Sequence, residues 1–108
     1  MAILHWKLQR ITAIILIPII IYLIVYFLNI HSLSYIQIKN DITSTFGIVF
    51  ISLASTMIFS HSSLGIETIL EDYIHEDRLQ KILINLSNII HGLMLLLTLI
   101  FLLMITRN

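Results

Sequence analysis

Residues Ile11 to Ile30 read ITAIILIPIIIYLIVYFLNI, and this stretch decides the class of fold. It carries no charged residue, and at about 1.5 Å per residue a helix of this length crosses a hydrocarbon core about 30 Å thick. Pro18 lies inside it, which a membrane helix tolerates because neighbouring helices satisfy the freed backbone groups. A signal peptide is the alternative, but the run is too long for one and no small-x-small cleavage site follows. We predict a membrane-spanning helix.

Two further apolar stretches follow. A second predicted span runs from about Phe46 to Leu70, and a third runs from Ile82 to Ile105. Between the spans we expect a polar loop from His31 to Thr45 and a charged turn from Glu71 to Lys81. No internal repeat or linker divides the chain. We therefore predict an all-α membrane protein with three transmembrane helices, whose 108 residues form a single membrane-anchor domain.

The composition agrees with this class. The chain is 58% apolar and 11% charged, whereas a soluble domain is about half apolar and about a quarter charged. The net charge is zero and no basic patch indicates nucleic acid, so lipid is the expected surrounding and nucleic acid is not an expected partner. The chain has no cysteine, which excludes a disulfide or a cysteine-held iron–sulfur cluster. The five histidines are therefore its strongest ligands for a transition metal.

The distribution of basic residues predicts the orientation in the membrane. Four lie before the first span or in the charged turn, and two lie on the opposite side: Lys7, Arg10, Arg78 and Lys81 against Lys39 and Arg107. Cytoplasmic or matrix-facing loops carry the excess of basic residues. We therefore expect the N-terminus inside and the C-terminus outside.

The second span carries more polar residues than lipid alone would accommodate, so we expect protein or a cofactor around it. Four of its residues, at offsets of i, i+4, i+7 and i+11, share one helical stripe: His61, Gly65, Thr68 and Asp72. Asp72 lies about 16 Å along the axis from His61. This spacing puts His61 near the middle of the bilayer and Asp72 near its inner surface.

His61 beside Gly65 is the strongest candidate for a cofactor site. The glycine leaves room for a bulky group one turn from the imidazole, an arrangement that suits an axial ligand to a flat haem. An ionisable residue inside the membrane is also a functional candidate by default. Two structural alternatives stay open, because a membrane histidine can bond a neighbouring helix and a small-residue face can be a packing seam.

Asp72 and Tyr73 end the second span at the interface. A phenol and a carboxylate at this place could hydrogen-bond and protonate a quinone head group. The alternative is an ordinary interfacial belt, in which tyrosine is common.

His91 and Arg10 are further candidates. His91 lies at a depth similar to that of His61, so it is a rival or second haem contact, or it bonds across helices with Asn88 or a partner. Arg10 lies on the inner side and could anchor a haem propionate, although snorkelling to phosphate is the simpler interpretation. The remaining histidines are expected to face solvent: His5, His31 and His75.

Two motifs together resemble a known family. Residues 61–75, HSSLGIETILEDYIH, resemble the H-x3-G-x6-D-Y-[VI]-H segment of the D-type membrane anchor of succinate dehydrogenase. Residues 6–13, WKLQRITA, with Pro18 downstream, are similar to the W-x-x-Q-R-x-T-A opening of the same family. The resemblance covers essentially the whole chain.

This resemblance implies an anchor of respiratory complex II, whose flavoprotein and iron–sulfur subunits lie on the inner side. Two small anchor chains form a heterodimeric helical bundle that holds one haem b, and they form the ubiquinone site with the iron–sulfur subunit. It implies that His61 is one axial ligand and that the sister cytochrome b anchor subunit supplies the other. It implies that Tyr73 hydrogen-bonds the quinone carbonyl with Asp72 beside it, and that Arg10 approaches a haem propionate. His91 has no counterpart in the motif.

The resemblance also implies a mitochondrial or bacterial inner membrane. Succinate would be oxidised on other subunits, so this chain is not expected to be catalytic for succinate itself. One alternative is a fumarate reductase anchor that runs the reverse reaction with a low-potential quinone, although the Asp72–Tyr73 pair favours a ubiquinone-type site. The other alternative is a cofactor-free structural subunit of another respiratory complex.

Overall fold

The computed structural model describes residues 2–107, and within this range it is helical with no β-strand. The helices are α1 (Ala2–Leu28), the short 3₁₀ helix η1 (Ile30–Ser32), α2 (Tyr35–Thr43), α3 (Thr45–Tyr73) and α4 (Asp77–Arg107). The three longest, α1, α3 and α4, are long and apolar enough to cross a membrane. The predicted all-α class with three transmembrane helices is confirmed.

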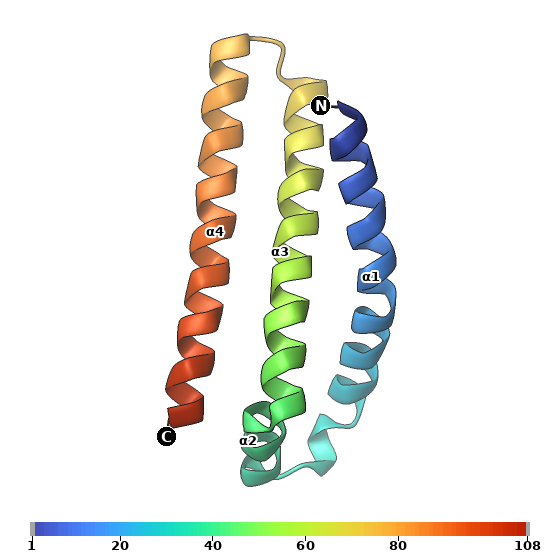
Figure 1. Cartoon of the computed structure of the whole chain (residues 1–108), viewed down its shortest axis with the longest axis vertical. Coiled ribbons are helices and arrows are strands. Elements are labelled where there is room, and N and C mark those ends of the chain that lie inside the picture. Colours follow the sequence, from blue (N-terminus) through green and yellow to red (C-terminus); the bar gives the residue numbers. More distant parts are fainter. Residues whose placement is uncertain (1, 108) are drawn as a thin grey trace.

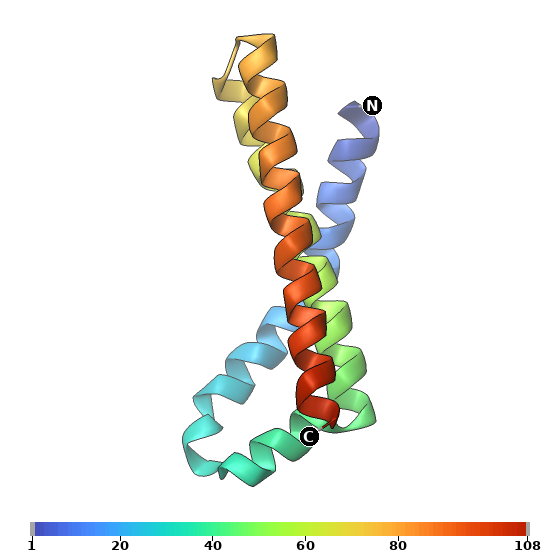
Figure 2. The ribbon, with the colours of Figure 1, turned by 90° about the vertical axis from the view of Figure 1, so that its left-hand side faces the viewer.

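Helix α3 is the central element of the bundle. It packs against α1 on one side and against α4 on the other (Figure 1). Figure 2 shows that α4 follows α3 closely along its length, whereas α1 crosses α3 at an angle and leans away over its second half. Pro18 lies inside α1 without ending it. The polar second span therefore lies between the two other long helices, as its composition requires.

The polar stretch that we expected to be a loop, 31–45, is mostly helical. It contains the end of η1 and all of α2. A capping box starts α2, because the Ser34 hydroxyl accepts from the Gln37 backbone N–H at 3.2 Å and the Gln37 side chain accepts from the Ser34 N–H at 2.8 Å. Reciprocal bonds of this kind satisfy two of the free donors at a helix start. The prediction of a loop was wrong because polarity alone does not exclude a helix, and the Ser-x-x-Gln signal starts one here.

A close approach joins α2 to α3. Ser44 caps α3 by accepting from the Gly47 backbone N–H at 3.0 Å. A Cβ atom on Gly47 would collide with the carbonyl oxygens of Asp41 and Ile42, the second of them at 2.7 Å. Glycine is therefore required at this position by the space available.

The charged turn, 71–81, is also shorter than expected. Helix α3 continues to Tyr73 and α4 begins at Asp77, so only residues 74–76 connect them. The Gln80 side chain donates to the Ile74 carbonyl at 2.8 Å, and Asp77 places a negative charge in the first turn of α4, where the helix dipole favours it. Capping and dipole effects thus extend both helices into the polar segment.

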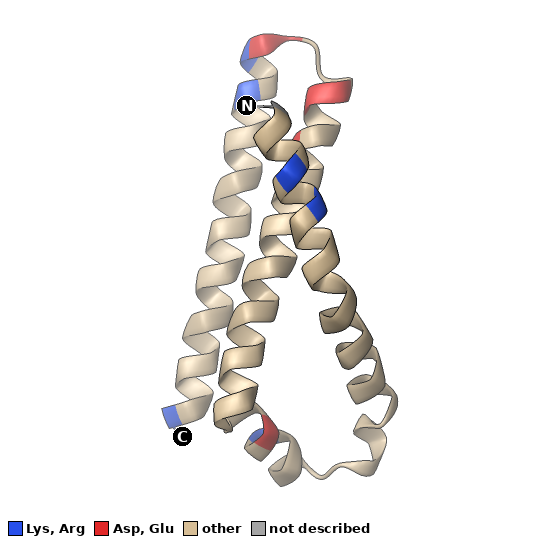
Figure 3. Cartoon of the chain, turned by 45° about the vertical axis from the view of Figure 1, so that its right-hand side comes forward, with Lys and Arg blue, Asp and Glu red and all other residues tan. Residues whose placement is uncertain are grey.

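Charge and burial together show a protein built for an apolar surrounding. Lysine, arginine, aspartate and glutamate lie mainly towards the two ends of the bundle, and the middle is almost free of them (Figure 3). Within the described residues the buried hydrophobic side chains are Ile19, Ala54 and Leu102, while many large apolar side chains are exposed on all three long helices. Because lipid covers such surfaces in a membrane, the chain is an integral membrane protein.

Candidate functional site

His61 lies half-buried in the middle of α3, where α1 packs against it. Its Nδ1 is 2.9 Å from Oγ1 of Thr12, a residue of α1 that is only 7% exposed. The Thr12 hydroxyl donates its single proton to the Leu8 carbonyl at 2.8 Å. Its oxygen is therefore left to accept from the Nδ1–H of His61, and this tautomer has its lone pair on Nε2.

Nε2 of His61 has no hydrogen-bond partner among the described residues. Gly65 lies one turn further along the same face of α3, as the predicted stripe requires, because α3 is continuous from Thr45 to Tyr73. A Cβ added to Gly65 would meet nothing nearer than the Gln9 side-chain nitrogen at 4.0 Å. Gly65 is therefore not a close-packing seam between the described helices, and a side chain at this position would meet no close neighbour.

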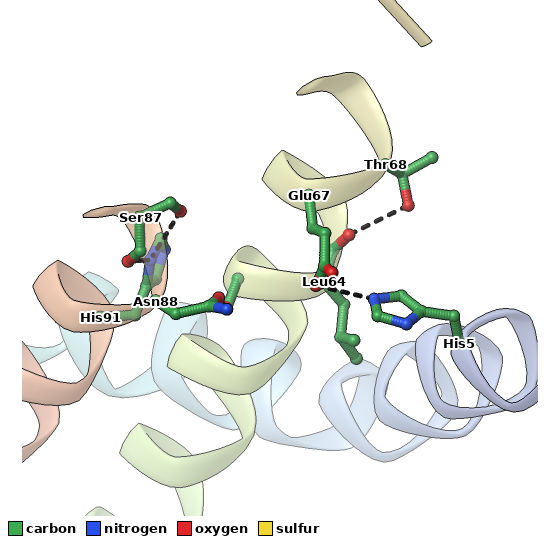
Figure 4. A network of polar contacts seen from close by, with 8 residues as sticks. His5, Leu64, Glu67, Thr68, Ser87, Asn88 and His91 are labelled. Carbon is green, nitrogen blue, oxygen red and sulfur yellow. Dashed lines mark hydrogen bonds and ion pairs between the residues drawn. The ribbon is translucent and has the colours of Figure 1, made fainter. Parts of the chain in front are cut away.

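His91, on α4, has both ring nitrogens engaged. Nδ1 lies 2.7 Å from the backbone carbonyl of Ser87, and Nε2 lies 2.9 Å from the hydroxyl of Ser62 on α3. Because a carbonyl only accepts, Nδ1 carries the proton and Nε2 accepts from Ser62. The Ser63 hydroxyl donates to Asn88 at 2.7 Å beside this pair. Figure 4 shows His91 with Ser87 and Asn88 on α4. We call the contacts of Ser62 and Ser63 with His91 and Asn88 the α3–α4 clasp.

His5 does not face solvent as we expected. Its Nε2 lies 2.9 Å from Oε2 of Glu67 on α3, and Figure 4 shows the two side chains facing one another. The side chain of His5 is 32% exposed and that of Glu67 is 21% exposed. The expectation failed because α1 begins at Ala2, so His5 belongs to a helix that packs on α3 rather than to a free end. An acidic residue in an apolar span needs a partner, and that signal would have pointed from Glu67 to a nearby base. His31 and His75 are exposed as expected.

The candidates for the quinone and the propionate lie near one end of the bundle. Tyr73 is 77% exposed at the end of α3, and Asp72 beside it is also exposed. The start of α1 lies at the same end (Figure 1). There the Arg10 guanidinium lies over the Trp6 ring, 5.1 Å from its centroid. Tyr73 is about 18 Å along the helix axis from His61, so the two candidate sites are separate.

Residues of α1, α3 and α4 line a groove of ≈ 560 Å³. Its polar lining residues are Thr12, Ser60, Ser63, Glu67, Asn88 and His91. His61 does not line it. The imidazole of His61 is therefore placed by the α1–α3 contact and not by this groove.

Comparison with known proteins gives two matches. The family described as the succinate dehydrogenase/fumarate reductase transmembrane subunit matches residues 1–101. A protein described as a succinate dehydrogenase membrane anchor subunit, from Reclinomonas americana, is 33% identical over 90 residues, which cover 80% of this chain and 74% of that protein. No solved structure matches. The chain thus belongs to the family of succinate dehydrogenase and fumarate reductase transmembrane subunits, the family that its two motifs resemble.

Proposed function

We propose that this chain is the membrane-anchor subunit of a succinate:ubiquinone oxidoreductase, in which it helps to hold haem b and forms part of the ubiquinone-reduction site. In this proposal the whole chain is one anchor domain. A flavoprotein subunit and an iron–sulfur subunit dock at its inner end and oxidise succinate, and a sister cytochrome b anchor subunit packs against it in the membrane. The family match supports the anchor role, and the Asp72–Tyr73 pair favours the ubiquinone enzyme over a fumarate reductase.

The environment of His61 is the observation that carries the haem proposal. A haem iron takes a neutral imidazole nitrogen with a free lone pair. His61 offers Nε2 for this purpose because Nδ1 is engaged by Thr12, and the open space at Gly65 gives a flat group access. Within residues 2–107 no three histidine, aspartate or glutamate side chains gather as a metal site, but an axial site needs only one ligand from this chain. When bound, haem b would supply a one-electron carrier.

The other candidate residues take supporting roles. Arg10 is exposed at the inner end of α1, and its guanidinium lies over the Trp6 ring. From this position the guanidinium is able to pair with a propionate. His91 has no free ring nitrogen within the described structure, so we assign it to the α3–α4 clasp in preference to a haem contact.

The quinone proposal rests on the exposed end of α3. Ubiquinone takes up two electrons and two protons, so its head group has to lie where an electron donor and proton sources meet. Tyr73 offers a hydroxyl that donates a hydrogen bond without bringing charge, and Asp72 offers a carboxylate beside it. Both are exposed, so both are available to a head group held under the iron–sulfur subunit.

Replacing His61 tests the haem assignment. In the purified complex, His61→Ala should abolish the low-spin haem spectrum or convert it to a high-spin one, because one of two axial ligands is lost. His75→Ala is the matched control, since His75 is exposed in the connection between α3 and α4. An unchanged low-spin signal in His61→Ala would reject the assignment. A wild-type complex with no haem absorbance would favour the cofactor-free alternative.

Orientation is tested by labelling single introduced cysteines, since the chain has none of its own. We expect a cysteine at position 75 to react with an impermeant reagent from the matrix or cytoplasmic side, and one at position 40 to react only from the other side. Labelling of position 40 from the inner side would reverse the proposed topology.

A further inference from the structure

The contact between Thr12 and His61 has a defined direction. Oγ1 of Thr12 lies 2.8 Å from the Leu8 carbonyl and 3.1 Å from the Gln9 carbonyl, and both of these groups only accept. A hydroxyl has one proton, which Thr12 gives to its own helix. The remaining contact, 2.9 Å to Nδ1 of His61, is therefore one in which the imidazole donates and the hydroxyl oxygen accepts.

The second intramembrane histidine shows the opposite arrangement. At His91 the imidazole donates to the Ser87 backbone carbonyl, and the Ser62 hydroxyl then donates to Nε2. Each ring thus has a hydroxyl next to it, but at His91 the hydroxyl occupies the lone pair, whereas at His61 it leaves the lone pair free. A generic interhelical bond would not need to spare Nε2.

Building on the proposed haem ligation by His61, we propose that Thr12 is a positioning residue for that ligand. Its hydroxyl oxygen accepts the Nδ1–H of His61, which fixes the tautomer and the rotation of the ring so that Nε2 presents its lone pair. Hydrogen bonds to the distal nitrogen of a metal-bound histidine orient the ring and make it more basic. Thr12 is suited to this role because it is 7% exposed and its own rotamer is held by the backbone of α1.

The experiment uses the assembled complex with Thr12→Val, which keeps the shape of the side chain and removes the acceptor. With Nδ1–H unpaired, the ring should rotate more freely and become less basic. We expect the midpoint potential of the haem to rise, the low-spin electron paramagnetic resonance g-values to shift, and haem retention in detergent to fall by roughly tenfold. Thr12→Ser keeps the hydroxyl and should restore all three.

Thr98→Val is the matched control. The Thr98 hydroxyl donates to the Met94 carbonyl of its own helix at 2.8 Å, as Thr12 does with Leu8, but it contacts no histidine in the described structure. This variant should keep the wild-type potential and spectrum. Thr12→Ala removes the same acceptor with a smaller side chain, so it decides the question if Thr12→Val does not assemble.

Several results would overturn the proposal. An unchanged potential and spectrum in Thr12→Val would show that the ring is held by other groups. An equal change in Thr12→Ser would show that the methyl group, not the hydroxyl, matters. Failure of both Thr12→Val and Thr12→Ala to assemble would show that Thr12 is needed for folding and does not act as a positioning residue. The haem proposal fails separately, since retention of the low-spin signal in His61→Ala rejects His61 as the ligand whatever the Thr12 variants show.

Discussion

The two sides of α3 treat their histidine contacts in opposite ways. On the side that meets α1, Thr12 binds one nitrogen of His61 and leaves the other without a partner in the described structure. On the side that meets α4, Ser62 and Ser87 occupy both nitrogens of His91. The first side keeps a chemical group available, and the second uses its polar groups to hold two helices together.

This difference gives a criterion for separating a candidate ligand from a structural residue inside a membrane. Both histidines lie in the interior of long apolar helices, so depth and residue type do not separate them. The neighbouring hydrogen-bond partners do. By the same criterion Tyr73 belongs with the available groups, because it is 77% exposed, and its replacement should affect chemistry more than stability.

Two replacements test this comparison, Tyr73→Phe and His91→Ala, and we expect Tyr73→Phe to have the larger effect. The variant keeps the ring and removes the donor, and leaving a buried partner unpaired costs about 1–3 kcal/mol. We expect succinate:ubiquinone reductase activity to fall roughly tenfold or more, since about 1.4 kcal/mol corresponds to a factor of ten. Succinate oxidation with an artificial acceptor, which takes electrons upstream, should stay near the wild-type rate, as should the haem spectrum.

Tyr35→Phe is the control for Tyr73→Phe. Tyr35 is 78% exposed, as Tyr73 is, but it starts α2 near the opposite end of the bundle. It should retain quinone reductase activity. Equal loss of the quinone and artificial-acceptor activities in Tyr73→Phe would indicate failed assembly, and full quinone activity would remove Tyr73 from the mechanism.

The parts of the fold that depend on hydrophobicity alone could be predicted from the sequence. Long runs of isoleucine and leucine with few charges leave a spanning helix as the main solution, so the three long helices were expected. The stripe of His61, Gly65, Thr68 and Asp72 follows from helical periodicity alone once α3 is continuous.

The other features of the structure depend on weaker local interactions or on contacts between residues far apart in the sequence. The start of α2 is set by the two reciprocal hydrogen bonds between Ser34 and Gln37. A capping interaction of this kind is worth only about 1 kcal/mol, so the polarity of the segment, which suggests a loop, hides it. The His5–Glu67 pair joins residues 62 positions apart and requires knowledge of how α1 packs on α3. The direction of the Thr12–His61 bond likewise depends on packing, because it needs the rotamer of one helix and the register of another.

The smallest expected effect comes from the side of α3 that meets α4, where both ring nitrogens of His91 are engaged. His91→Ala removes the contacts with Ser87 within α4 and the bond to Ser62 on α3. Interhelical hydrogen bonds in membranes are worth about 0.6 kcal/mol on average and up to about 1.7. We expect the low-spin haem spectrum and its midpoint potential to be unchanged, while the free energy of unfolding of the chain in detergent falls by about 1–2 kcal/mol, measured by titration with a denaturing detergent. Ser62→Ala should lose somewhat less, because the bond from His91 to Ser87 stays. In the double variant the two losses should be less than additive, with a coupling energy close to the interhelical value, since both single changes break the same bond. If His91→Ala lost the low-spin signal while His61→Ala kept it, the ligand would belong to α4 and the contrast between the two sides of α3 would have to be reversed.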